Sequence, residues 1–365
     1  MAKRLLIDAH EDLAYESLYG GFDYTRSVEE NRHGYKGPEK FQSMIGRPEL
    51  VKAGAAVIFG TVFLSPPGHG KGNYKNRVTT YVTSEDFHVA VLAQLDYYDR
   101  LCGEHPDQFF RIFDKNGLDT VLESWQSDPE NAHPTGLIGL LEGAEGLRSF
   151  EDLDVYYSRG VRLIGPVWQG GRWCAGTFSR DFPDALTAEG KTLLQAMSAR
   201  NFVLDISHMK NRSAMDALEY YDGIAAASHA NCNALLEGMK TERHLNDETI
   251  RMLIEHDGVM GVIPYNSFLY SEWKDGAGMP RDLVTLDTLA EHVDHICQLA
   301  GHSRAAAIGT DADGGFGYPD IPLEMNDISD IQKLGDRLRK RGFTDEDVDN
   351  VFYKNWLRLL ERALK

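Results

Sequence analysis

The chain has 365 residues and a formal net charge of -18, from 38 Lys and Arg against 56 Asp and Glu. This acidic balance excludes nucleic acid as an expected partner, because nothing would offset repulsion from its phosphates. No run of about 18 apolar residues exists to span a membrane, and the four cysteines lack the spacing of a disulfide framework or a thiolate zinc site, so we expect a cytoplasmic protein without a membrane partner.

The first predicted element is a short buried strand at residues 5–7, which is soon followed by His10 and Asp12. Side chains two residues apart in an extended chain project to the same side, so this imidazole and this carboxylate can bind one divalent ion. Such a pair suits zinc, manganese, iron or nickel better than calcium or magnesium. The alternative is an ordinary capping or turn arrangement, and the pattern downstream decides between the two.

Three further segments complete the first third of the chain. Residues 16–49 are polar, rich in Gly and Tyr and without a sustained period, which predicts a long loop that serves as a lid or as a solvated surface excursion. A second buried strand is predicted at residues 55–63, closed by the turn residues 65–68. Residues 84–113 carry apolar side chains at helical spacing, which predicts one long amphipathic helix with Ser84 as its N-cap.

Six more apolar runs follow, at residues 136–141, 160–168, 202–206, 223–227, 258–263 and 305–309. Helical patterns separate most of them, at residues 188–199, 211–220, 247–256 and 286–300, and residues 344–365 predict a C-terminal helix. Eight short apolar runs alternating with helices indicate a closed parallel barrel, because its strands are covered on both faces. We therefore predict an α/β fold, a (β/α)8 TIM-type barrel that forms a single domain over residues 1–365.

The competing architecture is a doubly wound open sheet. It would need a Gly-rich phosphate-binding turn after an early strand, and Asp8-Ala9-His10-Glu11 stands at that place instead. The sequence therefore favours the barrel.

Five of the predicted strands are followed by side chains that can bind metal. In a barrel the carboxyl ends of all strands meet on one face, which would bring together His10, Asp12, Glu142, His208, His229 and Asp311. This set suits two ions that share one carboxylate, a geometry that places metals about 3.5–4 Å apart around a bridging hydroxide. Two such ions activate water and polarise a carbonyl, so the pattern points to hydrolysis.

Several segments, in order along the chain, resemble one known family. They are Asp8-x-His10-x-Asp12-Leu13, Ile138-Gly139-x-x-Glu142-Gly143, Gly160-Val161-Arg162, Asp205-x-Ser207-His208, Ser228-His229, the segment from Arg243 to Glu248, and the segment from Gly309 to Gly314. Together they are similar to the membrane (renal-type) dipeptidase family, a dinuclear-zinc branch of the amidohydrolase superfamily. The resemblance implies a metal-dependent dipeptidase that hydrolyses the amide bond of a small dipeptide with a metal-bridged hydroxide.

The resemblance also implies a ligand set for two divalent ions, with zinc as the expected metal. By this similarity His10 and Asp12 would hold one ion, and His208 and His229 would hold the other. Glu142 would bridge the two.

Three further residues receive roles from the same resemblance. Asp311 would be the acid/base residue that handles the proton of the attacking water and of the leaving amine. Arg243 would bind the terminal carboxylate of the substrate, a role that suits a guanidinium because it can form two parallel hydrogen bonds. Tyr265 matches a family tyrosine near the seventh strand end and is expected at the substrate site.

One departure from the family pattern concerns the substrate. Trp168 stands after the fourth strand, where the family usually places a histidine that helps to polarise the scissile carbonyl. We expect Trp168 to form a wall of the substrate pocket, while Gln169 or Arg172 could supply a replacement donor. Ala9 and Glu11 also differ from the common family residues, but they leave both ligands intact.

Several alternatives stay open from sequence alone. The barrel could act on another amide, an N-acyl amino acid or a lactone, or it could be a non-catalytic binding barrel. The presence of Asp311 beside five ligands favours catalysis. A homodimer is compatible with the sequence, the remaining histidines are expected at the surface, and Asp313 is expected to end the eighth strand.

Overall fold

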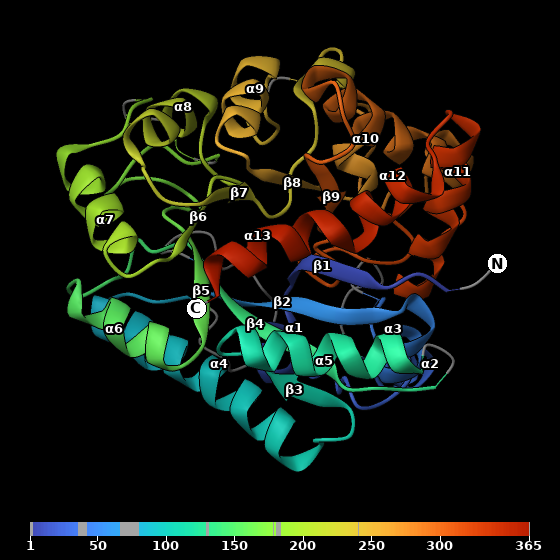
Figure 1. Cartoon of the computed structure of the whole chain (residues 1–365), viewed down its shortest axis with the longest axis horizontal. Helices are drawn as coiled ribbons and strands as arrows, with labels where there is room; N and C mark the ends of the chain where they lie inside the picture. Colours follow the sequence, from blue (N-terminus) through green and yellow to red (C-terminus); the bar gives the residue numbers. More distant parts are fainter. Residues whose placement is uncertain are drawn as a thin grey trace.

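The computed structural model describes residues 3–35, 42–65, 80–128, 131–177, 179, 184–239 and 241–364. Within these ranges, eight parallel strands follow one another in chain order around a barrel (Figure 1). They are β1 (Leu6–Glu11), β2 (Ala55–Phe63), β4 (Thr135–Glu142), β5 (Val161–Gly165), β6 (Val203–Asp205), β7 (Ala225–Ala227), β8 (Val259–Val262) and β9 (Ala306–Ile308). A short extra strand, β3 (Phe109–Arg111), pairs only with β4.

The first and last strands of the barrel meet through a few contacts. The backbone amide of Asp311 donates to the carbonyl of His10 at 3.1 Å, and Glu11 forms a parallel bridge with Ala312. The sheet is therefore nearly closed, and the prediction of a (β/α)8 TIM-type barrel is confirmed.

Helices cover the outside of the barrel (Figure 1). They include α4 (Ser84–Glu104), α5 (Lys115–Ser127), α6 (Glu151–Ser158), α7 (Ala188–Ser198), α8 (Asn211–Tyr220), α9 (Asp247–Glu255), α10 (Leu286–Ala300) and α11 (Leu334–Lys340). Short 3-10 helices lie at η3 (Asn233–Leu235), η4 (Asn266–Phe268), η5 (Arg281–Leu283) and η6 (Ile328–Lys333). Helices α7 to α10 lie where the periodicity predicted them.

The long connection after β1 contains short helices that its sequence pattern did not reveal. These are α1 (Leu13–Tyr15), a π turn η1 (Glu16–Gly20), α2 (Val28–Gly34) and α3 (Arg47–Ala53). Helix α2 begins with a capping box, in which Ser27 Oγ accepts from the Glu30 amide at 3.2 Å and the Glu30 carboxylate accepts from the Ser27 amide at 2.9 Å. Elements of seven residues or fewer are too short to show a period of 3.6. Residues 36–41 of this connection, and 66–68 of the turn predicted after β2, lie outside the described ranges.

The predicted helix over residues 84–113 is too long by about two turns. Helix α4 ends at Glu104, and the apolar residues that extended the pattern belong to β3. Its N-cap is Thr83, since the Thr83 hydroxyl accepts from the Asp86 amide at 3.1 Å. The prediction of Ser84 as the cap is therefore wrong by one residue.

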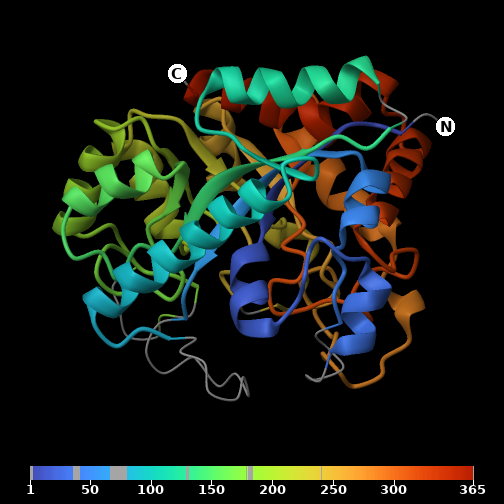
Figure 2. The same cartoon turned by 90° about the horizontal axis from the view of Figure 1, so that it is seen from below.

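The C-terminal segment closes one end of the barrel, together with α5 (Figure 2). It consists of α12 (Asp345–Asp349), a π turn η7 (Asn350–Lys354) and α13 (Asn355–Ala363). The indole N–H of Trp356 donates to the carbonyl of Ile308 at 2.8 Å, and its ring meets Phe59 edge-on at 5.3 Å. Trp356 thus packs against this end of the barrel, and the substrate site is expected at the opposite end, at the carboxyl ends of the strands.

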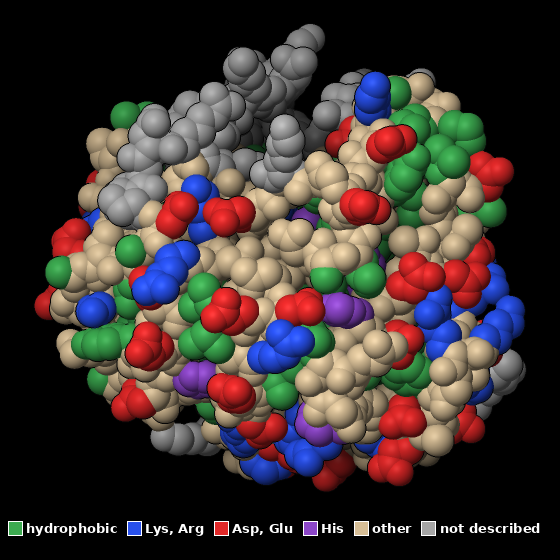
Figure 3. All heavy atoms as spheres, turned by 90° about the horizontal axis from the view of Figure 1, so that it is seen from above, with side chains coloured by type: hydrophobic (Ala, Val, Ile, Leu, Met, Phe, Trp, Pro, Cys, Tyr) green, Lys and Arg blue, Asp and Glu red, His purple; other side chains and the backbone are tan. Residues whose placement is uncertain are grey.

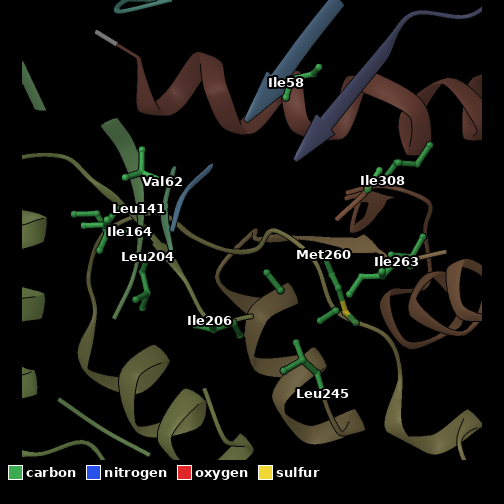
Figure 4. Close-up of a cluster of buried hydrophobic side chains, with 14 of the residues drawn as sticks. Ile58, Val62, Leu141, Ile164, Leu204, Ile206, Leu245, Met260, Ile263 and Ile308 are labelled. Atoms are coloured by element: carbon green, nitrogen blue, oxygen red, sulfur yellow. The ribbon is translucent and has the colours of Figure 1, made fainter. Parts of the chain in front are cut away.

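Apolar side chains of the strands pack with those of helices and loops in the larger buried cluster (Figure 4). Ile58, Leu141, Ile164, Leu204 and Ile308 come from five different strands, and all are buried. On the face seen in Figure 3, acidic and basic side chains are interspersed. No helix in the described ranges combines the length and the apolar composition needed to cross a bilayer.

Candidate metal centre

The carboxyl ends of β1 and β9 are tied together by Asp8. Its carboxylate accepts from the backbone amide of Thr310 at 2.8 Å and from the Thr310 hydroxyl at 2.7 Å. Asp8 is fully buried, and burial raises its pKa, while the bonds from Thr310 act in the opposite direction. Because His10 and Asp311 each lie within two residues of this clamp, Asp8 fixes the positions of both.

The ends of β6 and β7 are joined in the same way by Asp205. One carboxylate oxygen accepts from the Ser207 amide at 3.1 Å, from the Ser207 hydroxyl at 2.6 Å and from the Ser228 amide at 2.9 Å. The Ser228 hydroxyl donates to the other oxygen. His208 and His229 directly follow these two serines, so Asp205 sets the spacing between the two imidazoles.

The hydrogen bonds of Ser228 also select the tautomer of His229. Since the Ser228 hydroxyl donates its hydrogen to Asp205, its oxygen accepts from His229 Nδ1, which lies 2.8 Å away. The proton then sits on Nδ1 and leaves the lone pair on Nε2. The lone pair of Nε2 is the one that faces the other predicted ligands.

All five predicted ligands converge at the carboxyl ends of the strands, around Glu142. Oε1 of Glu142 lies 2.8 Å from His208 Nε2 and 3.4 Å from His229 Nε2, and these two nitrogens are 2.9 Å apart. Oε2 of Glu142 lies 3.7 Å from His10 Nε2. The two carboxylate oxygens therefore face different imidazoles, as a bridging carboxylate would.

Asp12 and Asp311 lie on the other side of His10. Asp311 Oδ1 is 3.8 Å from His10 Nε2, and ligand atoms of His10, Asp12 and Asp311 all lie within 4.8 Å of one another. A second group with the same spacing is formed by His10, Glu142 and His229. The sixth predicted residue, Asp311, thus lies as close to His10 as the ligands do.

The donor atoms of this site fit divalent cations. His10 Nε2 and Asp12 Oδ1 are buried and have no hydrogen-bond partner among the described residues, which is costly unless a ligand satisfies them. Burial, with the nearby Arg243, lowers the pKa of His208 and of His229 well below the usual range. Both rings are therefore neutral, and each can offer a nitrogen lone pair to a cation. Imidazoles and carboxylates in this combination suit zinc and similar metals.

The carboxyls of the site are protonated more readily than exposed ones. Burial raises the pKa of Glu142 to about 8 and that of Asp12 to about 7, and it raises the pKa of Asp311 well above its usual range. A metal ligand must be deprotonated, so cation binding would displace protons from these groups at neutral pH.

Arg243 lies near the predicted metal ligands and is almost completely buried, with 3% of its surface exposed. Its Nη1 donates to the carbonyl of Ser207 at 3.0 Å and to that of His229 at 3.1 Å. Its Nη2 has no hydrogen-bond partner among the described residues. One side of the guanidinium is thus anchored and the other is available at the cavity, whose lining includes Arg243.

A cavity of about 300 Å³ opens over the ligands, and its lining includes Glu142, His208 and Asp311. One wall is formed by Trp168, which lies 5.2 Å from the ring of Phe63 and 5.9 Å from that of His208. Trp168 thus lines the cavity, as expected from the sequence. The Trp168 amide donates to Oε1 of Glu145 at 2.9 Å, as do the next two amides of the loop, so Glu145 holds this wall in place.

Tyr265 also lines the cavity. Its ring stacks on Phe316 with centroids 4.0 Å apart, and its hydroxyl donates to Asp275. Neither Gln169 nor Arg172, the two possible replacement donors, is among the described residues that line the cavity. Arg172 instead donates to the carbonyl of Leu147 at 2.6 Å.

The structure differs from the sequence predictions for Asp313 and for several histidines. The prediction that Asp313 ends the eighth strand is wrong, because β9 ends at Ile308. Asp313 instead accepts from the Met44 amide at 2.6 Å and the Ser43 hydroxyl at 2.9 Å, and so anchors the long connection after β1. His88, His244 and His292 are buried, against the prediction of surface positions, and His69 lies outside the described ranges. Their neighbours come from distant parts of the chain, which a sequence pattern does not show.

The roles of Asp8 and Asp205 were missed at the sequence level, although a signal was present. Each stands two or three residues before a predicted histidine ligand, in Asp8-x-His10 and Asp205-x-Ser207-His208. Carboxylates that orient metal-binding side chains are a common feature of metal sites, so a repeated acidic residue near the predicted ligands was a usable signal.

Comparisons with known proteins agree with this geometry. A protein from Klebsiella pneumoniae, uncharacterised and encoded in the region 5′ of pqqA, is 29% identical over 247 residues, which are 65% of this chain and 86% of the relative. An uncharacterised dipeptidase from Schizosaccharomyces pombe is 28% identical over 237 residues, 62% of this chain and 54% of the relative. A metallopeptidase from Rhodobacter sphaeroides, solved with a phosphinate mimic of the dipeptide L-Ala-D-Ala, has the same fold, with a TM-score of 0.78, 21% identity and 99% of both chains covered.

The chain matches the family described as membrane dipeptidase (peptidase family M19) along its full length, residues 1–365. It follows that this chain belongs to the membrane dipeptidase family, peptidase family M19, and is a metal-dependent dipeptidase.

Proposed function

We propose that this chain hydrolyses dipeptides with two divalent ions, zinc in the first instance, held by His10, Asp12, Glu142, His208 and His229. The observation that carries the proposal is the position of the Glu142 carboxylate, with one oxygen 2.8 Å from His208 Nε2 and the other 3.7 Å from His10 Nε2. A carboxylate between two separate imidazole groups can serve two ions at once, while a single ion would leave some of these donors unused. Zinc is preferred because imidazole nitrogen and carboxylate oxygen are its usual ligands.

The bound ions would supply activation of water and polarisation of the scissile carbonyl. The protein must still deliver a proton to the departing amine, since an amine anion is a poor leaving group at neutral pH. We assign this role to Asp311, which lies at the end of β9 and lines the cavity. Burial raises the pKa of Asp311, and this favours a proton on its carboxyl at neutral pH.

Arg243 is proposed to bind the terminal carboxylate of the substrate. Its Nη1 is engaged by two backbone carbonyls, and its Nη2 remains for a ligand. A carboxylate is the complementary group, because it accepts charge-assisted hydrogen bonds from a guanidinium. Trp168 and Tyr265 would then form the walls between which the substrate side chains lie.

Metal-loaded protein assayed against a panel of small peptides tests the proposal. The panel holds L-Ala-L-Ala, L-Ala-D-Ala, Ala-Ala amide and tri-alanine, and L-Ala-D-Ala is included because a mimic of it is bound by the Rhodobacter sphaeroides structure. We expect zinc-dependent release of alanine from at least one free dipeptide, and much slower reaction of the amide and the tripeptide. Equal turnover of free and amidated dipeptides would remove Arg243 from its proposed role.

A further inference from the structure

Glu16 lies in the cavity next to the metal ligands but belongs to neither the ligand set nor the roles assigned above. The chain leaves β1 at Asp12 and turns through α1 into the π turn η1, whose first residue is Glu16. The Glu16 amide donates to the Asp12 carbonyl at 3.0 Å, so Glu16 stands one turn beyond Asp12. Residues four apart in a helical segment lie on the same side, and both line the cavity.

In the described part of the chain, no basic side chain is among the charged groups that act on the Glu16 carboxyl. Only 2% of the residue is exposed, and its Oε2 has no hydrogen-bond partner among the described residues. Burial raises its pKa well above the usual range, and the charges of Asp313 and Asp12 act in the same direction. A buried carboxyl in acidic surroundings is costly unless a cation or a set of donors meets it.

The Glu16 carboxyl occupies space that is left free because residue 20 is a glycine. A Cβ at Gly20 would overlap Oε2 of Glu16 and would lie 3.1 Å from its Cδ, so a residue without a side chain stands where the carboxyl needs room. Gly21, with φ of 87°, ends the turn in a left-handed conformation that glycine adopts easily. Single π turns of this kind occur frequently at functional sites.

The surroundings of Glu16 favour an organic cation. Next to it in the chain, Tyr15 lies 5.3 Å from the ring of Phe63, which in turn lies 5.2 Å from Trp168. All three rings line the cavity, and aromatic faces attract cations. In the same cavity Arg243 presents a guanidinium. A free dipeptide carries the complementary pair of charges, a carboxylate and an ammonium group.

We propose that Glu16 binds an ammonium group on the N-terminal residue of the substrate, and that it thereby makes the enzyme select free dipeptides over N-acylated amino acids. This inference rests on the proposed function. It adds a second charged anchor to Arg243, so that both ends of the substrate are recognised by charge. Glu16 is a substrate-binding residue in this account, and Gly20 is a positioning residue for it.

The test compares substrates that differ only in the ammonium group. Propionyl-alanine is Ala-Ala without its amino group, and lactoyl-alanine has a hydroxyl there. The parent should process Ala-Ala with a kcat/KM about 30- to 5,000-fold above that of either analogue, the range that corresponds to about 2–5 kcal/mol for removal of one partner of a buried charge pair. Glu16→Gln should remove most of this difference by slowing Ala-Ala, while the rates for the two analogues stay within about threefold of the parent.

A second variant and two controls keep the result interpretable. Gly20→Ala leaves Glu16 in place but pushes its carboxyl aside, so it should lower the preference for Ala-Ala in part. Glu104→Gln, at an exposed site on α4, should leave all rates unchanged. Both Glu16→Gln and Gly20→Ala should keep the metal content of the parent.

Lys-Ala and norleucyl-Ala identify the source of the ammonium. If Glu16→Gln slows both in proportion to Ala-Ala, the bound group is the α-ammonium. If it slows only Lys-Ala, the bound group is the side-chain ammonium, and the proposed selection of free dipeptides over N-acylated amino acids is overturned.

Two results would overturn the inference while leaving the proposed function intact. One is a parent enzyme that hydrolyses Ala-Ala and propionyl-alanine equally well. The other is a Glu16→Gln variant that slows all substrates by the same factor or loses metal, since this would place Glu16 in support of the metal site. Failure of the metal-loaded parent to hydrolyse any dipeptide would instead contradict the proposed function.

Discussion

Replacement of Arg243 tests substrate binding apart from support of the metal site. The two Nη atoms of its guanidinium have different environments. Nη1 donates to the carbonyls of Ser207 and His229, which lie in the two segments that carry the histidine ligands. Nη2 has no partner among the described residues and is available to a substrate carboxylate. Arg243→Ala removes both contributions, and Arg243→Lys keeps the charge but loses the fork that allows both at once.

The expected magnitude follows from these contacts. Loss of the partner of a buried charged group costs about 2–5 kcal/mol, which is a fall in kcat/KM of about 30- to 5,000-fold for a free dipeptide. The bonds to the two backbone carbonyls contribute about 1.5–3 kcal/mol each, and their loss should lower the unfolding free energy of the protein. Arg243→Ala should therefore be impaired both in its reaction with free dipeptides and in its stability.

The assay measures kcat and KM for Ala-Ala and for Ala-Ala amide in the parent and in both variants, with metal content as a control. We predict that Arg243→Ala lowers kcat/KM for Ala-Ala by the factor given above and hardly changes the slow reaction of the amide. Arg243→Lys should give a kcat/KM for Ala-Ala between those of the parent and Arg243→Ala. An equal loss for both substrates at parental metal content would refute the reasoning, since the effect would then not depend on the substrate carboxylate.

Three further predictions concern the metal site. Asp311→Asn should keep both ions and the fold but lose about 10²- to 10⁴-fold in kcat, as measured by steady-state kinetics with metal analysis, whereas loss of metal would make Asp311 a ligand. Because the pKa of Asp12 is raised to about 7 and that of Glu142 to about 8, metal binding at pH 7 should release protons and tighten as the pH rises towards 8. Calorimetric titration of zinc in two buffers of different ionisation enthalpy measures this release, and identical heats would count against it. Asp205→Ala should weaken zinc binding by about 10- to 100-fold, the usual effect of losing a group that orients metal ligands, and unchanged affinity in a competition titration would contradict that role.

The sequence predicted the barrel because its strands are buried on both faces and so appear as uninterrupted apolar runs, such as residues 136–141 and 258–263. It predicted that the candidate ligands converge because their strands end in histidine or carboxylate side chains, and the topology of a barrel brings all such ends together. Short elements did not give such a signal. Strand β3 has three residues and was absorbed into the pattern of α4.

The supporting residues could not be placed from sequence because their partners are remote in the chain. Asp8 binds Thr310, which is 302 residues away, and Asp313 binds Ser43 and Met44. The burial of His244 depends on a ring contact with Phe268 at 4.9 Å, which only the folded chain provides. The sequence pattern placed Glu16 at the start of a polar loop. Its position at the cavity results from the turn that η1 makes after Asp12.

The metal content of saturated protein tests the central claim most directly. Parent protein would be loaded with zinc, freed of unbound ion by gel filtration and analysed by mass spectrometry, beside His10→Ala, His208→Ala and Glu142→Ala. The account predicts about two equivalents per chain for the parent, about one for each histidine variant, and loss at both sites for Glu142→Ala, because Glu142 faces both groups of ligands. A parent that is fully active with no more than one equivalent under saturating zinc would contradict it.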